Sequence, residues 1–310
     1  MNLLAIYRVM LMARQIDKVS REITQRGEAY FHLSGAGHEG SVALAPHLTA
    51  DDWLHCHYRD KALLLARGVE PKQFLDSMLC NSGSSSRGRR MSAFFCDRQL
   101  KILSMVTPTG NNALQAVGVA AAVKQQACRP IVYCGVGDGT TQQGEYLEAM
   151  GEAVREHLPV LFVIQNNRLA ISTSTRGRTF FSLPSGDAES YCGIPIARID
   201  GRNVVQATDQ FGEIVKQMRI CRKPQIVVLD VDRLSDHTNA DDQLVYRTDA
   251  EIRHAAESGD PIKRLRVALM RAGHDEESLE RIGQEVEQVV EAAEREACAT
   301  EPPSTQTSVK

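Results

Sequence analysis

Residues 131–141 read Ile-Val-Tyr-Cys-Gly-Val-Gly-Asp-Gly-Thr-Thr, and this stretch determines the class of fold. It begins with an apolar, β-branched run typical of a buried strand and passes through a glycine-rich turn into the helical pattern of residues 141–157. At such a junction the free backbone N–H groups at the start of the helix face the space beyond the carboxyl end of the strand. The stretch therefore predicts a site that binds an anion.

Similar strands and helices alternate along the rest of the chain. Short apolar runs recur at residues 160–164, 196–199 and 225–229, and helical patterns occupy residues 110–124 and 204–221. Continuous apolar runs of this length are typical of strands that are buried on both faces of a parallel sheet. We therefore predict an α/β fold with a doubly wound, mostly parallel sheet and helices on both of its faces.

The C-terminal part of the chain is expected to be a loop followed by helices. Residues 232–249 are polar and show neither helical nor strand periodicity, which indicates a long loop, and loops of this length are often functional. Helical patterns that open at Asp260-Pro261 and span residues 276–297 predict a helical C-terminal extension. We expect a single domain over residues 1–298, and a disordered tail or linker rich in Ser, Thr and Pro at residues 299–310.

Composition and charge narrow the class of partner. The chain has 310 residues, 43% of them hydrophobic and 24% charged, and a formal net charge of -3. Charges of both signs are interspersed, so no basic surface typical of a protein that binds nucleic acid or an anionic membrane is expected. No stretch approaches the roughly 20 apolar residues that a transmembrane helix requires. The eight cysteines are scattered without a C-x-x-C pair, which favours free thiols in a reducing cytoplasm.

One candidate ligand for the anion site is a dinucleotide, because glycine-rich turns between a strand and a helix also bind NAD. Here the glycines are spaced G-x-G-x-G rather than G-x-G-x-x-G. The next strand ends in Gln165-Asn166-Asn167 instead of the acidic residue that usually binds a ribose. Both differences disfavour a nicotinamide-binding module. Such a module remains the alternative from a different class of protein.

The other candidate is a Mg²⁺ ion that holds a diphosphate. Asp138 and Asn167 stand at the carboxyl ends of consecutive predicted strands, where a parallel sheet can bring their side-chain oxygens close together. One anionic and one neutral oxygen suit Mg²⁺. The residue types alone leave a second interpretation open, in which Asp138 caps the following helix and Asn166-Asn167 form a turn.

A longer pattern resembles a known family. Gly137-Asp138-Gly139, with Asn166-Asn167 at the end of the next strand, resembles the thiamine-diphosphate motif. The continuation Leu169-Ala170-Ile171-Ser172-Thr173 resembles the α subunits of 2-oxoacid dehydrogenases in particular. The resemblance covers roughly residues 1–275 and implies the thiamine-diphosphate-binding fold. Further similar segments are Ser34-Gly35-Ala36-Gly37-His38-Glu39, His57-Tyr58-Arg59-Asp60, Gln115-Ala116-Val117-Gly118, and Gly259-Asp260-Pro261-Ile262 with Arg264.

The resemblance implies a site for thiamine diphosphate and Mg²⁺. Asp138, the Asn167 side chain and the backbone carbonyl of Leu169 are then the metal ligands, although the family usually has Gly-Tyr where this chain has Arg168-Leu169. Tyr58 and Arg59 match the pair that binds the diphosphate oxygens, a role that suits a phenol and a permanent cation. A surface ion pair of Arg59 with Asp60 is the simpler alternative. The other expected cofactor contacts are Thr107 and Thr109, where the aminopyrimidine ring is received, and Gly137, Gly139 and Thr140 in the motif itself.

His237 is the expected catalytic residue and a further cofactor contact. The long loop contains His237-Thr238-Asn239-Ala240-Asp241-Asp242 and then Tyr246-Arg247, which resembles the H-x-x-x-D-D loop of the family with its Y-R pair. An imidazole beside the cofactor can hydrogen-bond charge that develops on the substrate or move a proton near neutral pH. Without those flanking residues, a solvated loop histidine would be the simpler interpretation.

Gln165 is a departure from the family pattern. Many members have an arginine here that points at the phosphates, so this chain lacks one positive charge at that place. The difference predicts weaker binding of the cofactor.

The resemblance also implies an activity and partners. Relatives oxidatively decarboxylate a 2-oxoacid and pass the acyl group to a lipoyl arm on a dihydrolipoyl acyltransferase core. In two-chain members a β subunit supplies a glutamate to the aminopyrimidine, so we expect this chain to be inert alone and to assemble with a β subunit as an α₂β₂ heterotetramer. The expected substrate is a branched-chain 2-oxoacid or pyruvate, and residues 30–34 favour the 2-oxoisovalerate type. An acetoin dehydrogenase α subunit and a non-catalytic scaffold of the same fold are the alternatives.

Overall fold

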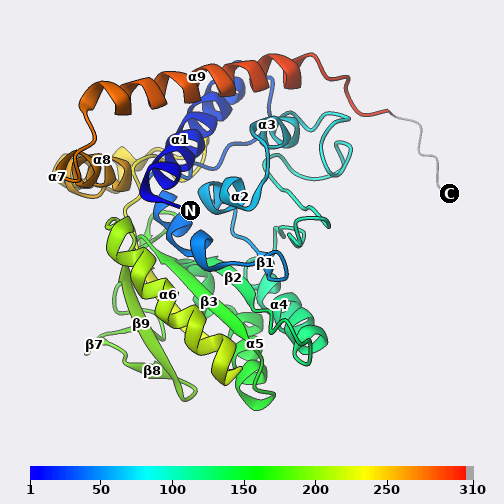
Figure 1. Ribbon diagram of the computed structural model, residues 1–310, viewed down its shortest axis with the longest axis vertical. Coiled ribbons are helices and arrows are strands. Elements are labelled where there is room, and N and C mark those ends of the chain that lie inside the picture. The colour runs from blue at the N-terminus through cyan, green and yellow to red at the C-terminus, as the bar shows by residue number, and fades with distance from the viewer. Residues whose placement is uncertain (305–310) are drawn as a thin grey trace.

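The computed structural model describes residues 1–304, and a six-stranded sheet forms its centre (Figure 1). The strands are β1 (Trp53–His55), β2 (Val132–Gly137), β3 (Val160–Asn166), β8 (Ser190–Tyr191), β9 (Ile194–Asp200) and β10 (Gln225–Asp230). Their order across the sheet is β1-β2-β3-β10-β9-β8, and every neighbouring pair is parallel except β8 with β9. The predicted mostly parallel α/β fold is confirmed.

Side chains of the strands alternate between two hydrophobic clusters, one on each face of the sheet. In β3, Leu161 and Val163 belong to the first cluster, and Val160, Phe162 and Ile164 belong to the second. Successive side chains of a strand point to opposite faces, so helices cover both faces, as predicted. The first face is covered by the 3₁₀ helix η1 (Glu39–His47) and α6 (Val204–Cys221), and the second by α4 (Asn111–Val123) and α5 (Gly144–Arg155).

The remaining helices form a group beyond the first face. They are α1 (Leu3–Gln25), α2 (Lys61–Arg67), α3 (Pro71–Leu79), α7 (Asp249–Ser258), α8 (Pro261–Arg271) and α9 (Glu276–Cys298). Helix α9 crosses α1 and α3 at the top of Figure 1 and contacts both. Asp260 and Asp275 cap α8 and α9 through their side chains, and Pro261 occupies the first turn of α8, where its missing N–H costs nothing. The predicted helical C-terminal extension is confirmed. No helix within residues 1–304 is both long and apolar enough to cross a bilayer.

The structure differs from the sequence-based expectation at one helix and contains an edge strand that was not predicted. The edge strand β1 was missed because three residues are too few to show a period. The helix expected from Thr141 begins as a 3₁₀ turn, η2 (Asp138–Gln142), and becomes α5 only after Gln143. Gln143 has extended backbone angles, φ -74° and ψ 137°, which separate the two helices. Two short hairpins lie between β3 and β9, namely β4 (Leu169–Ala170) with β5 (Thr173–Ser174) and β6 (Ser182–Leu183) with β7 (Gly186–Asp187).

The expected long loop is ordered by contacts with an N-terminal segment. It contains one short 3₁₀ helix, η3 (Gln243–Val245), before α7 begins. The Leu234 N–H donates to the Ala36 carbonyl over 3.1 Å, and the Asn239 N–H donates to the His32 carbonyl over 3.2 Å. Close approach of the two segments also requires Gly37, because a Cβ there would lie 1.8 Å from the Asp232 carbonyl oxygen. The loop is therefore fixed beside residues 32–38.

Residues 299–304, the part of the expected tail that the structure describes, lie against the rest of the chain. Lys72 donates to Thr300 Oγ1 over 3.2 Å, and the Ser82 N–H donates to the Glu301 carbonyl over 3.0 Å. The remainder of that expectation, residues 305–310, lies outside the described residues. We propose that residues 1–298 form a single domain, because both hydrophobic clusters share one sheet.

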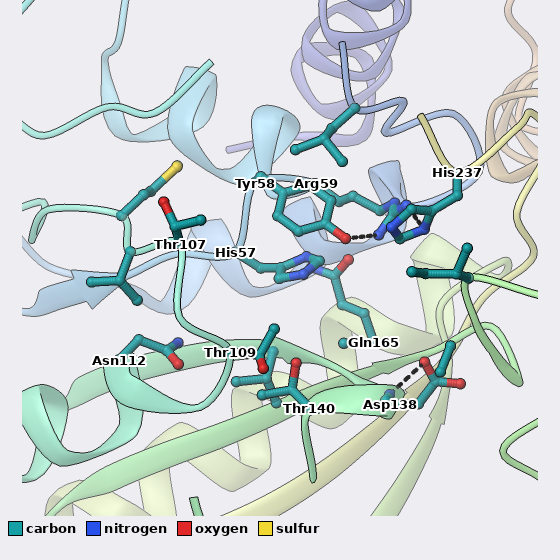
Figure 2. A pocket seen from close by; sticks show the side chains of 18 of the residues that line it. His57, Tyr58, Arg59, Thr107, Thr109, Asn112, Asp138, Thr140, Gln165 and His237 are labelled. Atoms are coloured by element: carbon teal, nitrogen blue, oxygen red, sulfur yellow. Dashed lines mark hydrogen bonds between the residues drawn. The ribbon is translucent and has the colours of Figure 1, made fainter. Parts of the chain in front are cut away.

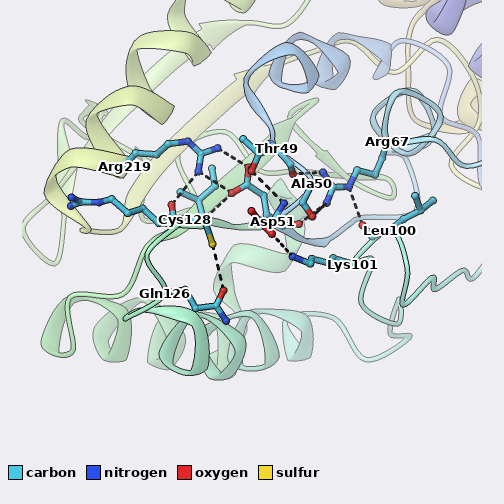
Figure 3. A network of polar contacts seen from close by, with 12 residues as sticks. Thr49, Ala50, Asp51, Arg67, Leu100, Lys101, Gln126, Cys128 and Arg219 are labelled. Carbon is cyan, nitrogen blue, oxygen red and sulfur yellow. Dashed lines mark hydrogen bonds and ion pairs between the residues drawn. The ribbon is translucent and has the colours of Figure 1, made fainter.

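A polar network joins the sheet edge to α6 and α2 (Figure 3). The carboxylate of Asp52 is fully buried and accepts hydrogen bonds from Arg219 over 2.6 and 3.0 Å. It also accepts the backbone N–H groups of Thr49 and Ile131 over 2.7 and 2.8 Å. Arg67 donates to the backbone carbonyl of Asp52 over 2.7 Å. The buried carboxylate thus depends on Arg219 for its countercharge.

Replacing this countercharge should destabilise the fold. Arg219→Met keeps the aliphatic stem but leaves the Asp52 carboxylate buried without a cation, so we expect the free energy of unfolding to fall by about 3 kcal/mol. Urea denaturation followed by circular dichroism measures this change. Lys216→Met on the same helix removes an exposed cation and should change stability by less than about 0.5 kcal/mol. Equal effects of the two substitutions would contradict the role of the buried pair.

Candidate active site

A cavity of about 480 Å³ lies at the carboxyl ends of β2 and β3 (Figure 2). Its walls come from segments that are far apart in the sequence, from Phe31 to Thr238. The structure brings all of the predicted site residues to this cavity. They are Tyr58, Arg59, Thr107, Thr109, Gly137, Asp138, Gly139, Thr140, Asn167, Leu169 and His237.

Pairing of the two central strands sets the floor of the cavity. Gly137 of β2 is in register with Gln165 of β3, so the residues that follow each strand emerge at the same edge of the sheet. Asp138 and Asn167 are among them, as the sequence predicted. Gly139 allows the turn to approach the next hairpin, because a Cβ there would lie 2.6 Å from the Cβ of Ala170.

Asp138 is a buried carboxylate without a cationic hydrogen-bond partner among residues 1–304. Its Oδ2 accepts the Thr175 hydroxyl over 2.7 Å, and its Oδ1 accepts the Gly139 N–H over 3.0 Å. Burial raises the pKa of this carboxyl above its usual range, because desolvation disfavours the charged form. A bound cation would compensate that cost, so the environment of Asp138 fits a metal ligand.

Asn167 is held by contacts at both ends of its amide. Its Nδ2 donates to His38 Nε2 over 3.0 Å, and its Oδ1 accepts the Leu169 N–H over 3.0 Å. His38 is fully buried, and burial lowers its pKa well below the usual value, so its ring is neutral and can accept. The amide oxygen therefore faces the turn that contains Leu169.

A metal at this place must use mixed oxygen ligands. Within residues 1–304, no three His, Cys, Asp or Glu side chains are arranged to hold an ion. One carboxylate, one amide oxygen and one backbone carbonyl remain available from Asp138, Asn167 and Leu169, and hard oxygen donors of this kind suit Mg²⁺. The donor set therefore fits the expected ion.

Arg59 connects three segments above this floor (Figure 2). Its guanidinium donates to the Ser34 carbonyl over 2.8 Å, to the Tyr58 hydroxyl over 2.6 Å and to His237 Nδ1 over 3.1 Å. Its contacts contradict the alternative of a surface ion pair with Asp60, because Arg59 is only 4% exposed and Asp60 is not one of its hydrogen-bond partners. A buried guanidinium with neutral partners attracts an anion into the cavity.

His237 is neutral at physiological pH. Burial, assisted by the charges of Arg59 and Arg233, lowers the pKa of His237 to about 4. Since Nδ1 accepts from Arg59, the ring proton resides on Nε2. His237 therefore offers a hydrogen-bond donor, fixed in one tautomer.

Apolar side chains form the remaining wall of the cavity. They are Phe31, Leu33, Met91, Phe94, Met105, Val106 and Ile171. Most of the cavity surface beyond the polar floor is therefore suited to an aliphatic group.

Several residues of the site were not predicted. His38 and His57 line the cavity and stood inside segments that resemble the family, so their position beside predicted residues was an available signal. Asn112 also lines it, and Thr175 supports Asp138 from a hairpin that no pattern indicated. Gln165 was noticed only as a departure, whereas its side chain lines the cavity and donates to Asp60.

Comparison with known proteins identifies the family. The sequence model of the dehydrogenase E1 component matches residues 7–306. The chain belongs to the dehydrogenase E1 component family. Membership implies thiamine diphosphate as the cofactor, which agrees with the fold and with the cavity at the ends of β2 and β3.

Among curated relatives of this E1 chain are α subunits of two dehydrogenases. The mitochondrial 2-oxoisovalerate dehydrogenase subunit alpha of Caenorhabditis elegans is 26% identical over 274 residues, which are 87% of this chain and 63% of that protein. The human protein of the same name is 25% identical over 281 residues, 90% of this chain and 63% of its own. Pyruvate dehydrogenase E1 component subunit alpha of Mycoplasma genitalium is 28% identical over 291 residues, 92% of this chain and 78% of its own. The chain thus spans less than two thirds of the length of the 2-oxoisovalerate relatives.

The protonation of His237 can be measured directly. In labelled protein, the imidazole NMR signals of His237, assigned with His237→Gln, should titrate with a pKa of about 4. Arg59→Met should raise this pKa toward the usual value of about 6.5, because it removes a nearby positive charge. Arg21→Met on α1 is the control and should leave it unchanged. A wild-type pKa near 6.5 would contradict the buried, neutral imidazole.

Proposed function

We propose that this chain is the α subunit of a thiamine-diphosphate-dependent 2-oxoacid dehydrogenase. The observation that carries the proposal is the convergence of metal-binding, anion-binding and proton-donating groups on one cavity. These groups come from five separate stretches of the chain, around residues 58, 107, 138, 167 and 237. A scaffold that no longer binds the cofactor would have no need to keep all of these groups together. Their presence in one cavity therefore argues against the scaffold alternative.

The floor of the cavity would hold Mg²⁺ and the diphosphate. Asp138, Asn167 and the Leu169 carbonyl would supply the metal ligands. Tyr58 and Arg59 would donate to the diphosphate oxygens, since Arg59 is the buried cation of the cavity wall. The segment that contains Thr107 and Thr109 would receive the aminopyrimidine ring, and the turn from Gly137 to Thr140 would approach the diphosphate through its backbone.

His237 would act on the substrate side of the site. When bound, thiamine diphosphate supplies a carbanion and an electron sink for decarboxylation of a 2-oxoacid. The neutral His237 would present its Nε2 proton to an oxygen on which charge develops and would hold that proton in a fixed direction. Arg59 keeps the ring in this tautomer and so serves both the anion and the histidine.

The substrate would be a 2-oxoacid with an aliphatic side chain. Phe31, Met91, Phe94 and Met105 favour a branched chain over the single methyl group of pyruvate. Tyr30 does not contribute to this wall, because it is 85% exposed. Acetoin, which lacks a carboxylate, is the alternative substrate.

A β subunit would complete the site. The aminopyrimidine needs a carboxylate, and the family supplies it from the β chain, so the isolated α chain would be inert. Large apolar side chains are exposed at the cavity and on the loop that contains His237, with Ile171 at 53%, Leu244 at 67% and Val245 at 81%, which supports a protein surface that is covered in an α₂β₂ assembly. A lipoyl-bearing acyltransferase core would then accept the acyl group.

The proposed location of the chain is the cytoplasm, because all eight cysteines are free.

The activity can be tested with the complex purified through a tagged chain from its own cells. Dye-coupled oxidation of 2-oxoisovalerate, pyruvate and acetoin, with and without thiamine diphosphate and Mg²⁺, should give cofactor-dependent turnover that is highest with 2-oxoisovalerate. Asp138→Ala should abolish this turnover, because the metal loses its anionic ligand. Turnover by the α chain alone, or none from a complex that contains a β chain, would overturn the proposal.

Loss of the His38 contact should weaken the metal site without removing a ligand. His38→Leu frees the Asn167 amide to turn, and we expect about tenfold weaker Mg²⁺ binding in the presence of thiamine diphosphate. His38→Gln supplies another acceptor and should retain most of the affinity. Calorimetric titration of Mg²⁺ measures both variants, and equal affinities of His38→Leu and the wild type would exclude this supporting role.

A further inference from the structure

Gln165 is a buried polar side chain in the cavity with an incomplete set of hydrogen bonds. It is 1% exposed and lines the cavity at the end of β3. Its Nε2 donates to Asp60 Oδ1, whereas its Oε1 has no partner among residues 1–304. Figure 2 shows Gln165 between Asp138 and the Tyr58-Arg59 pair. A buried amide in a cavity wall that lacks part of its hydrogen bonds points to a ligand in that cavity as its missing partner.

Asp60, the partner of Gln165, is a fully buried carboxyl group, and its hydrogen-bond donors within the described residues 1–304 are all neutral. It accepts the His57 N–H over 2.7 Å and the Tyr133 hydroxyl over 2.9 and 3.0 Å. Gly135 of β2 leaves the space for this carboxyl, because a Cβ there would lie 2.5 Å from Asp60 Oδ2. No cation compensates the buried charge through these contacts.

The cations next to Asp60 in the sequence point elsewhere. Arg59 donates to Ser34, Tyr58 and His237, as described above. Lys61 donates to Asp17 over 2.8 Å and to the Leu33 carbonyl over 2.9 Å. The side chains of Arg59 and Lys61 therefore donate to groups other than the Asp60 carboxyl.

The titratable groups that face Asp60 are uncharged at neutral pH. They are Cys56 and His57 on its own turn and Tyr133 and Cys134 on β2. Burial raises the pKa of both thiols and of the Tyr133 hydroxyl, and it lowers the pKa of His57. Burial likewise raises the pKa of Asp60 to about 7, so this carboxyl can gain a proton in the physiological range.

The present orientation of the Gln165 amide is unsuited to an anion. While the Asp60 carboxylate holds Nε2, the buried acceptor Oε1 has no partner among residues 1–304, and Gln165 lines the cavity in which Tyr58 and Arg59 would bind a diphosphate. A half-turn of the amide would present Nε2 to the anion and Oε1 to Asp60. That orientation needs a donor on Asp60, which only the protonated carboxyl has.

We propose that Gln165 binds the diphosphate through its Nε2 and that a proton taken up by Asp60 holds the amide in that orientation. This inference rests on the proposed function. No covalent bond forms or breaks, and the proton comes from solvent. Because proton and diphosphate bind together, the affinity for the cofactor falls as the pH rises past neutrality.

Calorimetric titration of thiamine diphosphate with Mg²⁺ into the purified complex at pH 6 and pH 8 tests this coupling. Uptake of one proton with a midpoint near pH 7 makes binding about tenfold weaker at pH 8 than at pH 6. The phosphate of the cofactor also titrates, so the relevant quantity is the difference between the wild type and Asp60→Asn. The asparagine donates permanently to Gln165 Oε1, so this variant should bind tightly at both pH values. Repeating the titration in two buffers with different ionisation enthalpies gives the number of protons taken up on binding.

Two further variants separate Gln165 from general effects of substitution. Gln165→Leu removes the donor, and it should bind about tenfold more weakly than the wild type at pH 6, without the extra pH dependence. Gln115→Leu removes an exposed amide of α4 outside the cavity and should behave like the wild type. If Asp60→Asn does not fold, Tyr133→Phe replaces it. Loss of the Tyr133 donor raises the pKa of Asp60 further, so the fall in affinity should move to higher pH.

The outcomes distinguish this inference from the proposed function. A wild type that binds with the same proton count and pH dependence as Asp60→Asn, or a Tyr133→Phe profile identical to that of the wild type, overturns the inference and leaves the proposed function standing. No saturable binding of the cofactor to the wild-type complex at either pH overturns the proposed function itself.

Discussion

The buried guanidinium of Arg59 is the interaction on which the site depends. It receives its direction from the Ser34 carbonyl, and it then fixes the Tyr58 hydroxyl and the His237 ring. The segment around Ser34 is itself fixed by Asp17 of α1, whose carboxylate accepts the Ser34 hydroxyl over 2.6 Å and the Gly35 N–H over 2.8 Å. Lys61 and these donors lower the pKa of Asp17 below its usual range despite burial. One chain of charge-assisted bonds therefore runs from the first helix to the loop that contains His237.

The electrostatic balance of the cavity also follows from these contacts. Within residues 1–304, the buried carboxylates near its floor, Asp138 and Asp60, have no cationic hydrogen-bond partner, and Arg59 has no carboxylate partner. Each of these groups would be stabilised by a ligand of opposite charge, or by a proton in the case of Asp60. A metal diphosphate supplies both signs at once, which explains why charges that would be costly in an ordinary core are tolerated here.

The fold could be predicted from the sequence because its signals are local, whereas the supports of the site could not. Every residue of β3 is buried, so its apolar run is visible in the sequence, and the three residues of β1 show no such signal. Asp138 and Asn167 were indicated by their places at the ends of predicted strands and by the resemblance to the family, and Tyr58 by the resemblance alone. The contacts of Thr175 with Asp138, of His38 with Asn167 and of Gln165 with Asp60 join residues 37, 129 and 105 positions apart. Such partners are decided by packing of distant segments, which neither period nor spacing records.

Anchoring of the loop that contains His237 to residues 32–38 has a consequence for the order in which the chain folds. The His32 N–H donates to the side chain of Asn239, a contact that spans 207 residues of chain. Closing so long a loop costs conformational entropy, so we expect these contacts to form late in folding. On the ribosome, residues 32–38 cannot make these contacts until the loop has been synthesised. Gly37 likewise cannot pack against Asp232 before then. The wall of the cavity around residues 32–38 is therefore completed only after residues 232–239 have joined it.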